Sequence, residues 1–269
     1  MSANKIAIIC LAGFLISATA PAVSAQSTAS TQDPTYKQET GRQTEKRTTG
    51  TQVTGTNKSA SDYDHRVGKA ADVLLDLTKA SDKKIPNELL ERAEAIAVIP
   101  NMMKGAFGIG GRYGKGLISQ RLATGHWSPG TFIEVGGGSF GAQLGVSATD
   151  LVLVFTDKKA LDLLEKGRDL KLGVDASIVA GPIGRSAEAG VNANLASAIY
   201  AYSRSKGLFA GVALDGAVLE IDDSANRKVY GPTVTAKEIL DGKAAMNSTV
   251  KPFADALERV VPKKRLSQK

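Results

Sequence analysis

The sequence predicts an α+β protein with a strongly curved, mostly antiparallel, glycine-rich sheet or partial barrel, packed with helices at both ends of the domain. Helical periodicity occurs near the start and end of the folded part, alternating apolar runs fill its middle, and glycines recur inside those runs. Glycine within a strand marks a bulge, a bend or a close backbone approach, and a small curved sheet needs such positions repeatedly.

The first 25 residues are expected to be an export signal rather than part of the fold. Lys5 precedes the apolar run from Ile6 to Ile16, which is short for a membrane span, and the small residues of Ala22–Ala25 suit a signal peptidase. Cleavage there removes Cys10, the only cysteine. The mature chain is therefore expected to be periplasmic or secreted and to have neither a disulfide nor a thiol nucleophile.

Residues 26–63 differ in composition from the remainder of the chain. They include ten threonines and five glutamines among 38 residues, with few apolar side chains. Such a segment buries too little apolar surface to offset the entropy lost on ordering, so we predict a disordered leader. Residues 64–269 are predicted to be a single domain.

The first predicted element of the domain is an amphipathic helix that starts near Asp64. Its apolar stripe consists of Val67, Ala70, Ala71, Leu74 and Thr78. Basic residues flank the stripe, so one interpretation is a helix that meets a bilayer: Arg66, Lys69, Lys79, Lys83 and Lys84. We favour packing of the stripe on the domain, because three aspartates dilute the positive charge: Asp72, Asp76 and Asp82.

Strands are expected to fill the middle of the chain. Pro86 begins a short helix that reaches Ala93, and the run from Ala95 to Pro100 is predicted as a buried strand. Further extended segments are predicted at 117–122, 131–147, 150–156, 170–181, 191–203 and 207–221. Ser205–Gly207 between the last two is typical of a hairpin turn. One helix interrupts the strands, beginning at Thr156 or Asp157 and ending at Gly167.

Two helices are predicted near the C-terminal end. Thr235 and Glu238 have the spacing of a capping box, which begins the first of them. The second has an apolar face formed by Phe253, Leu257, Val260 and Val261.

The glycine-rich segment from Gly105 to Leu122 resembles a phosphate-binding loop only superficially. In a P-loop a serine or threonine follows the Gly-Lys pair, but here Gly116 follows Lys115. A dinucleotide-binding turn leads into a helix, whereas the residues after Gly116 alternate like a strand. We therefore interpret these glycines as architectural.

The composition argues against an enzyme. His65 and His126 are the only histidines, so no zinc site of the multi-histidine type can form. No catalytic residue, metal or cofactor is predicted. Without the signal, which contains only one charged residue, the net charge of +7 falls to +6. Such a basic excess favours an anionic partner such as a nucleic acid, a membrane surface or an acidic polymer.

Seven motifs in order resemble the SYLF domain family, over about residues 89–240. They are "AIAVIP", "GIGGRYGKG", "HWSPGTFIEVGGGSFGAQLG", "DLVLVF", "LGVDASIVAGPIGR", "IYAYSRSKGLFAGVALDG" and "VYGPTVTAKEIL". The resemblance implies a non-enzymatic domain that binds anionic phospholipids, notably phosphoinositides, and in some members actin. No nucleic acid is then expected. In an exported protein, phosphatidylglycerol, cardiolipin or another acidic surface lipid is the expected ligand.

The basic residues inside these motifs are the candidate phosphate-binding residues: Arg112, Lys115, Arg121, Arg185, Arg204 and Lys206. The leading hypothesis is an exported protein that associates peripherally with anionic membranes through them, with Arg112, Lys115 and Arg121 as one phosphate-facing group. The alternative hypothesis is an interaction protein that binds an acidic polymer or a filament such as actin.

Overall fold

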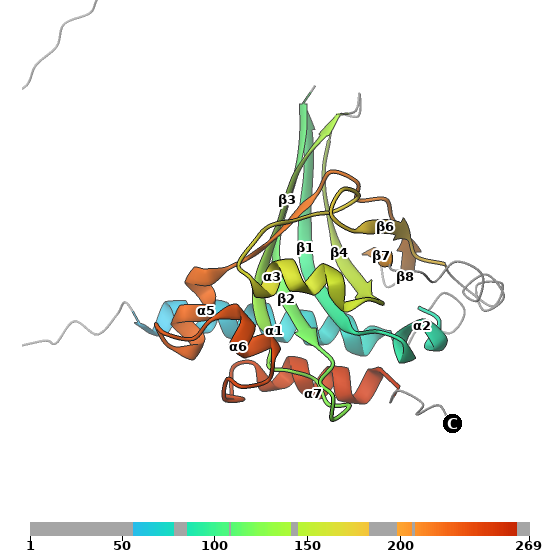
Figure 1. Ribbon diagram of the computed structural model, residues 1–269. Coiled ribbons are helices and arrows are strands. Elements are labelled where there is room, and N and C mark those ends of the chain that lie inside the picture. The colour runs from blue at the N-terminus through green and yellow to red at the C-terminus, as the bar shows by residue number, and fades with distance from the viewer. Residues whose placement is uncertain are drawn as a thin grey trace, which may run out of the picture. The chain divides into compact units, whose positions relative to one another are not determined.

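The computed structural model describes residues 56–77, 85–107, 109–140, 145–182, 198–205 and 208–262, and within these ranges the strands form one nine-stranded sheet. The sheet is strongly curled into a half-barrel, with helices packed against it (Figure 1). The predicted fold class is therefore confirmed. The export signal and most of the predicted leader lie outside the described residues, as do Arg185 and Lys206.

The sheet has the strand order β5-β9-β3-β2-β1-β4-β7-β6, and β8 pairs with the end of β7 that β6 leaves free. All pairings are antiparallel except that of β6 with β7. The strands are β1 (Ala95–Phe107), β2 (Ile109–Gln120), β3 (Thr131–Phe140), β4 (Gly145–Phe155), β5 (Leu170–Lys171), β6 (Ser177–Ala180), β7 (Ala198–Ser205), β8 (Leu208–Gly211) and β9 (Val218–Ile221).

Both faces of the sheet carry an apolar core, because the strands are apolar at consecutive positions rather than only at alternate ones. Val98 and Leu117 belong to the core on the first face, which is covered by α1 (Thr56–Asp76), α2 (Asn87–Glu91), α5 (Asp223–Tyr230) and α7 (Lys251–Val260). Ile99 and Ile118 belong to the core on the second face, which is covered by η1 (Lys158–Ala160), α3 (Leu161–Glu165) and α6 (Ala236–Leu240).

Helix α1 packs the described part of its predicted stripe into the first core, whereas Thr78 lies outside the described residues. Val67, Ala70 and Leu74 are fully buried, so the interpretation of a packed helix rather than a membrane-facing one is confirmed. The helix begins at Thr56, within the segment predicted as leader. Tyr63 packs edge-on against Phe132, with ring centroids 5.6 Å apart. The helix therefore extends across the predicted domain boundary at residue 64.

The predicted caps form as expected. Asp157 accepts a hydrogen bond from the backbone of Lys159 at the start of η1, and Gly167 has a φ of 65° just after α3. Thr235 and Glu238 make both bonds of the capping box at the start of α6. Helix α5 was not predicted, because its sequence, DSANRKVY, is largely polar. None of the described helices is long and apolar enough to cross a membrane.

A bulge in β1 bends the sheet. The pairing of β1 shifts register between Ile99 and Met102, and Asn101 takes a φ of 50°, which asparagine adopts more readily than most residues. Gly114 and Gly116 of β2 lie under this bulge. A Cβ atom at Gly116 would overlap the Val98 carbonyl oxygen and lie 2.8 Å from the Cα of Ile99. Gly114 and Gly116 are thus architectural, as predicted for this segment.

We expect Gly116→Ala to lower the free energy of unfolding by about 1–3 kcal/mol, since the added methyl group must displace the backbone of β1. Urea denaturation followed by circular dichroism measures this change. Gly138→Ala is the matched control, because no atom lies within 4 Å of the Cβ position there. Its effect should stay within about 0.5 kcal/mol. Equal losses in the two variants would contradict the close approach at Gly116.

Candidate functional site

The four longest strands continue past the helices as a small sheet (Figure 1). We call this part the distal sheet; it consists of Met102–Phe107 of β1, Ile109–Tyr113 of β2, Gly136–Phe140 of β3 and Gly145–Thr149 of β4. Beyond Gly136 of β3 and before Asp150 of β4, its outer strands have no further strand partner among the described residues. The pairing of β9 with β3 stops at Gly136, and the pairing of β7 with β4 starts at Asp150.

The first face of the distal sheet exposes large apolar side chains. Met103 and Tyr113 are cross-strand partners, and each is 48% exposed. The neighbouring positions Gly111, Gly138 and Ala148 are small and also exposed. The result is an uncovered apolar pair on a floor of small residues, of the kind that marks interaction sites.

The second face of the distal sheet carries two cations. Lys104 and Arg112 are paired directly across β1 and β2. The sequence has no aspartate or glutamate from residue 95 to 133 or from residue 135 to 149. The distal sheet is therefore free of carboxylates.

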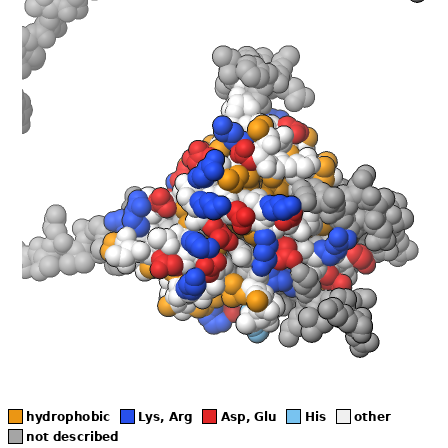
Figure 2. Space-filling model, in the orientation of Figure 1, with side chains coloured by type: hydrophobic (Ala, Val, Ile, Leu, Met, Phe, Trp, Pro, Cys, Tyr) orange, Lys and Arg blue, Asp and Glu red, His pale blue; other side chains and the backbone are white. Residues whose placement is uncertain are grey.

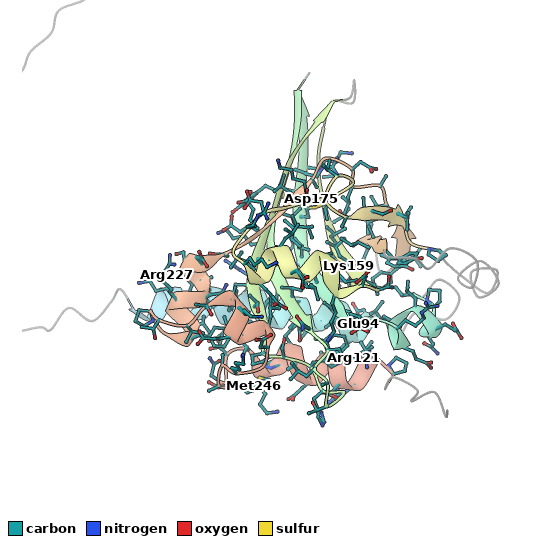
Figure 3. All side chains as sticks on the ribbon, viewed as in Figure 1. Glu94, Arg121, Lys159, Asp175, Arg227 and Met246 are labelled. Carbon is teal, nitrogen blue, oxygen red and sulfur yellow. The ribbon has the colours of Figure 1, made fainter. Side chains whose placement is uncertain are left out.

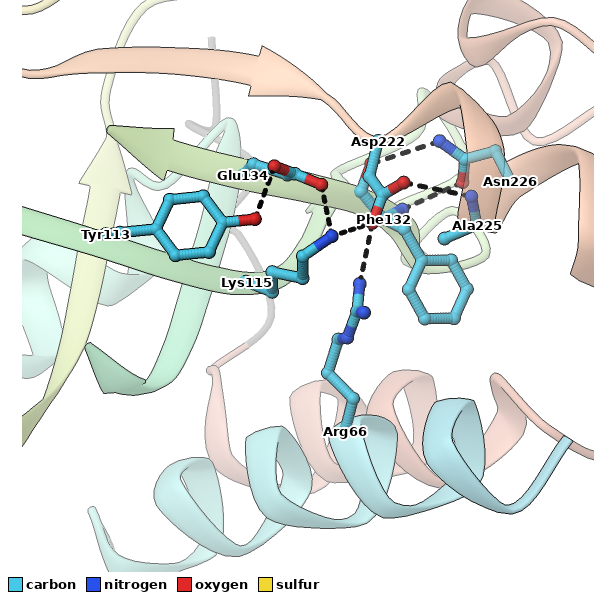
Figure 4. Close-up of polar contacts among 8 residues, drawn as sticks. All are labelled: Arg66, Tyr113, Lys115, Phe132, Glu134, Asp222, Ala225 and Asn226. Atoms are coloured by element: carbon cyan, nitrogen blue, oxygen red, sulfur yellow. Dashed lines mark hydrogen bonds and ion pairs between the residues drawn. The ribbon is translucent and has the colours of Figure 1, made fainter. Parts of the chain in front are cut away.

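A buried carboxylate joins the base of the distal sheet to α1 and α5 (Figure 4). Asp222 caps α5 by accepting a hydrogen bond from the Ala225 backbone through Oδ1. Its Oδ2 accepts from Arg66 of α1 at 3.0 Å and lies 3.4 Å from the Lys115 Nζ of β2. Glu134 of β3 also pairs with Lys115. A single carboxylate thus connects two helices with the sheet.

Tyr113 connects this network to the exposed apolar pair. Its hydroxyl donates to Glu134 Oε2 at 2.7 Å (Figure 4). Burial and the hydrogen bond to Glu134 both raise the pKa of Tyr113 above its ordinary value. The phenol therefore stays protonated and fixes the ring over the base of the distal sheet.

Contacts with opposite charges keep the network ionised. Burial alone would raise the pKa of Asp222, but the Ala225 backbone, Arg66 and Lys115 together hold that pKa below its ordinary value. Burial likewise opposes the charge of Lys115, yet the bond to Glu134 and the nearby Asp222 raise its pKa above the ordinary value. Both groups are therefore charged at neutral pH, and Lys115 has strong partners inside the protein.

Arg204 is also neutralised within the fold. On β7, it pairs with Asp76 of α1 and with Asp150 of β4, the latter at 2.6 Å from Nη2. Asp150 additionally accepts a hydrogen bond from the backbone of Asn101 in the bulge. These residues line a polar cavity of about 380 Å³ between α1 and the sheet.

Arg121 lies at the opposite end of the fold from the distal sheet (Figure 3). It is 3% exposed and donates to the carbonyl oxygens of Ala93, Leu90 and Pro262. Its guanidinium also lies over the Trp127 ring, 4.7 Å from the centroid. Desolvation lowers the pKa of Arg121, although Glu94 and Glu258 oppose this effect.

The predicted phosphate-facing group therefore does not form. Arg112 and Lys115 are an odd number of positions apart on β2 and so lie on opposite faces of the sheet, and Arg121 is buried. Of the four described candidates, only Arg112 is neither deeply buried nor in an ion pair with a described residue. Lys104 was not among the candidates. Lys104 could be recognised only from the strand register, which places it opposite Arg112. The sequence alone does not show this register.

The positive charge of the chain is unevenly distributed. Within the described ranges, acidic residues slightly outnumber basic ones, so the basic excess lies outside them, in segments such as 78–84 and 263–269. Figure 2 shows lysine and arginine interspersed with aspartate and glutamate over the body of the fold. The distal sheet is thus distinguished by its absence of carboxylates, not by a broad positive surface.

The described residues contain no group of three or more histidine, cysteine or carboxylate side chains that could hold a metal. His126 is exposed, and its Nδ1 lies 3.1 Å from Glu258 Oε1, with no nucleophile joined to it in the described part of the chain. Three of the charged side chains that line the 380 Å³ cavity form ion pairs, Arg204 with Asp76 and with Asp150.

Comparison with known proteins shows the family to which this chain is related. The family model described as "Ysc84: Las17-binding protein actin regulator" matches residues 136–260. Protein YSC84 of Saccharomyces cerevisiae is 40% identical over 200 residues, which cover 72% of this chain and 42% of that protein. SH3 domain-containing YSC84-like protein 1 of Xenopus laevis is 32% identical over 206 residues, covering 74% and 61%. The matched region thus spans about half the length of these relatives.

We expect Asp222→Asn to lower the free energy of unfolding at pH 7 by about 1.5–3 kcal/mol, because asparagine can still cap α5 but cannot pair with Arg66 and Lys115. Since the folded pKa of Asp222 is lowered, its stabilisation is present above the ordinary value of 3.8 and is lost as the pH falls through the folded pKa. The difference from the wild type, measured by urea denaturation, should therefore shrink in acid.

The neighbouring Asp223→Asn is the control for this substitution. Asp223 is exposed, and its ion pair with Arg227 is long, at 3.9 Å. Its replacement should change the free energy of unfolding by less than about 0.5 kcal/mol. A loss for Asp222→Asn no greater than this would show that the buried carboxylate does not hold α1 on the sheet.

Proposed function

This chain belongs to the SYLF family, also called Ysc84, and we propose that it is a non-enzymatic protein that binds anionic phospholipid surfaces through its distal sheet. The single observation that carries the proposal is the composition of that sheet. It exposes Met103 and Tyr113 on one face, carries Lys104 and Arg112 on the other, and contains no carboxylate. On the face of the molecule that Figure 2 shows, charges of both signs are mixed over the body of the fold.

These features suit the boundary between water and lipid. Transfer of apolar side chains out of water lowers the free energy of the system. Tyrosine is favoured at the headgroup level because its ring is apolar and its hydroxyl polar. Each cation near an anionic surface adds about 1 kcal/mol, and an aspartate or glutamate at the same place would be repelled. A glycine-rich sheet also lets the backbone approach the surface closely.

The expected affinity of the distal sheet alone is modest. Two cations contribute about 2 kcal/mol, and completing the burial of two half-exposed apolar side chains contributes about 2 kcal/mol more. A total near 4 kcal/mol corresponds to a dissociation constant of about 1 mM. Stable attachment therefore needs further contacts, for which the basic sequences at 78–84 and 263–269 are suitable in composition.

The location and the lipid follow from the sequence prediction of an export signal. We propose a peripheral association with a membrane outside the cytoplasm, with phosphatidylglycerol, cardiolipin or another acidic lipid as the surface. Phosphoinositides are the ligand class that the family resemblance suggests. The distal sheet is suited to detect the charge of the headgroup, since it offers cations rather than a specific pocket.

A second candidate function is binding to a protein filament. The family description, "Las17-binding protein actin regulator", favours it. In that case the exposed pair of Met103 and Tyr113 would contact a protein surface, and sedimentation with filaments rather than with vesicles would reveal the partner.

The test is co-sedimentation of the protein with phosphatidylcholine vesicles that contain or lack phosphatidylglycerol. The wild type should sediment with the anionic vesicles and be released by salt. Met103→Glu should weaken binding about tenfold, because it removes apolar contact and adds a repelled charge. Met246→Glu is the matched control, since Met246 is 44% exposed but lies far from the distal sheet (Figure 3).

Equal binding by both variants would rule out the distal sheet as the contact. Wild-type protein that ignores anionic vesicles but sediments with actin filaments would replace the lipid proposal with the filament one.

A further inference from the structure

The two cations on the second face of the distal sheet are arranged as a pair that could hold one anion, rather than as scattered positive charges. We propose that Lys104 and Arg112 are a phosphate-binding pair, and that their ligand is the phosphate group of an anionic lipid headgroup. This inference deepens the membrane binding proposed above and rests on it.

The register places the two cations side by side. Lys104 is the partner of Arg112 across β1 and β2, and Ser147 of β4 continues the same row beyond Lys104. Side chains at directly opposed positions have Cβ atoms about 5 Å apart, and like charges there repel each other. An anion bound between the two cations removes this repulsion, so the free protein holds the pair in an arrangement that favours an anionic ligand.

No described carboxylate offers that anion. Neither cation has an ion pair within 4.0 Å among the described residues. The nearest carboxylates along the strands, Glu134 and Asp150, pair with Lys115 and Arg204. Both carboxylates lie on the first face, opposite the two cations. Asp215 lies on the segment that passes Gly137, but it too forms no ion pair with Arg112.

Arg112 has a donor that the fold does not satisfy. Its Nε is shielded from solvent, yet it has no hydrogen-bond partner among the described residues. Arg112 is paired with Gly137 of β3 on its other side, and the segment at Gly216 and Ala217 lies close over Gly137. This segment explains why the Arg112 side chain is half-buried. A partly buried guanidinium loses little freedom when it binds, and its fork of donors matches phosphate oxygens.

The position of the pair along the strands matches the depth of headgroup phosphates. Beyond Lys104, β1 continues through Gly105 to Phe107, and beyond Arg112, β2 continues outward to Ile109. These residues are uncharged, and three strand residues extend about 10 Å. Interfacial protein segments enter the boundary of headgroups and acyl chains by about 5–10 Å. With the uncharged tip immersed, the row of Lys104 and Arg112 is level with the phosphates.

The test compares Lys104→Gln/Arg112→Gln with Lys243→Gln/Lys251→Gln. Both doubles remove two positive charges, but the control cations are exposed and lie in the C-terminal part of the chain, Lys243 between α6 and α7 and Lys251 in α7. Vesicle titration with phosphatidylglycerol should show binding weakened about thirtyfold for the first double and little changed for the second. The slope of log affinity against log salt should fall only for the first.

Thermal melting of the free protein gives a second readout. Removing two opposed like charges should leave the melting temperature unchanged or raise it, whereas a purely structural pair would lower it. The single variant Arg112→Lys, which keeps the charge but loses the fork, should show intermediate binding.

The outcomes separate this inference from the proposed function. If Met103→Glu weakens vesicle binding while the Lys104/Arg112 double binds like the wild type, the distal sheet still contacts lipid but the phosphate pair is wrong. If wild-type protein does not bind anionic vesicles, both proposals fail. If millimolar glycerol phosphate displaced the protein completely from the vesicles, the ligand of the pair would be a free phosphate instead of a membrane lipid.

Discussion

The close passage of β1 over β2 is the constraint on which the rest of the fold depends. Gly116 has no side chain where the backbone of Val98 and Ile99 crosses it, and the bulge up to Met102 follows directly. This bend divides the long strands into two parts. One part carries an apolar core on each face beneath the helices, and the other part continues as the distal sheet. A side chain at Gly116 would force the strands apart where the two parts meet.

Ion pairs then determine which cations remain available. Lys115, Arg204 and Arg66 are near the body of the fold, where Glu134, Asp76, Asp150 and Asp222 neutralise them. Arg121 donates hydrogen bonds to backbone carbonyl oxygens at the end of α2 and just after α7. Lys104 and Arg112 lie past the bend, where the strands carry no carboxylate. Among these six cations, the two that lie past the bend are the ones that form no ion pair with a described residue and are not buried against backbone carbonyls.

Local structure was largely predictable, because its causes lie within a few residues. The buried stripe of α1, the capping box at Thr235 and the glycine end of α3 each depend on neighbours less than two helical turns away. Helix α5 was missed because its sequence, DSANRKVY, is largely polar, although Asp222 provides an N-cap directly before it. The candidate site was predicted only in part: Arg112 was named, but its neighbour Lys104 was not.

The sequence by itself determined the fold class and the position of most helices and strands, because alternation and caps act over short distances along the chain. The tertiary structure alone decided which charges meet. Arg66 and Asp222 are 156 positions apart, and Lys115 and Asp222 are 107 apart, yet each pair is in contact. Coulomb attraction depends on distance in space and on burial, and neither quantity can be obtained from the spacing of residues along the chain.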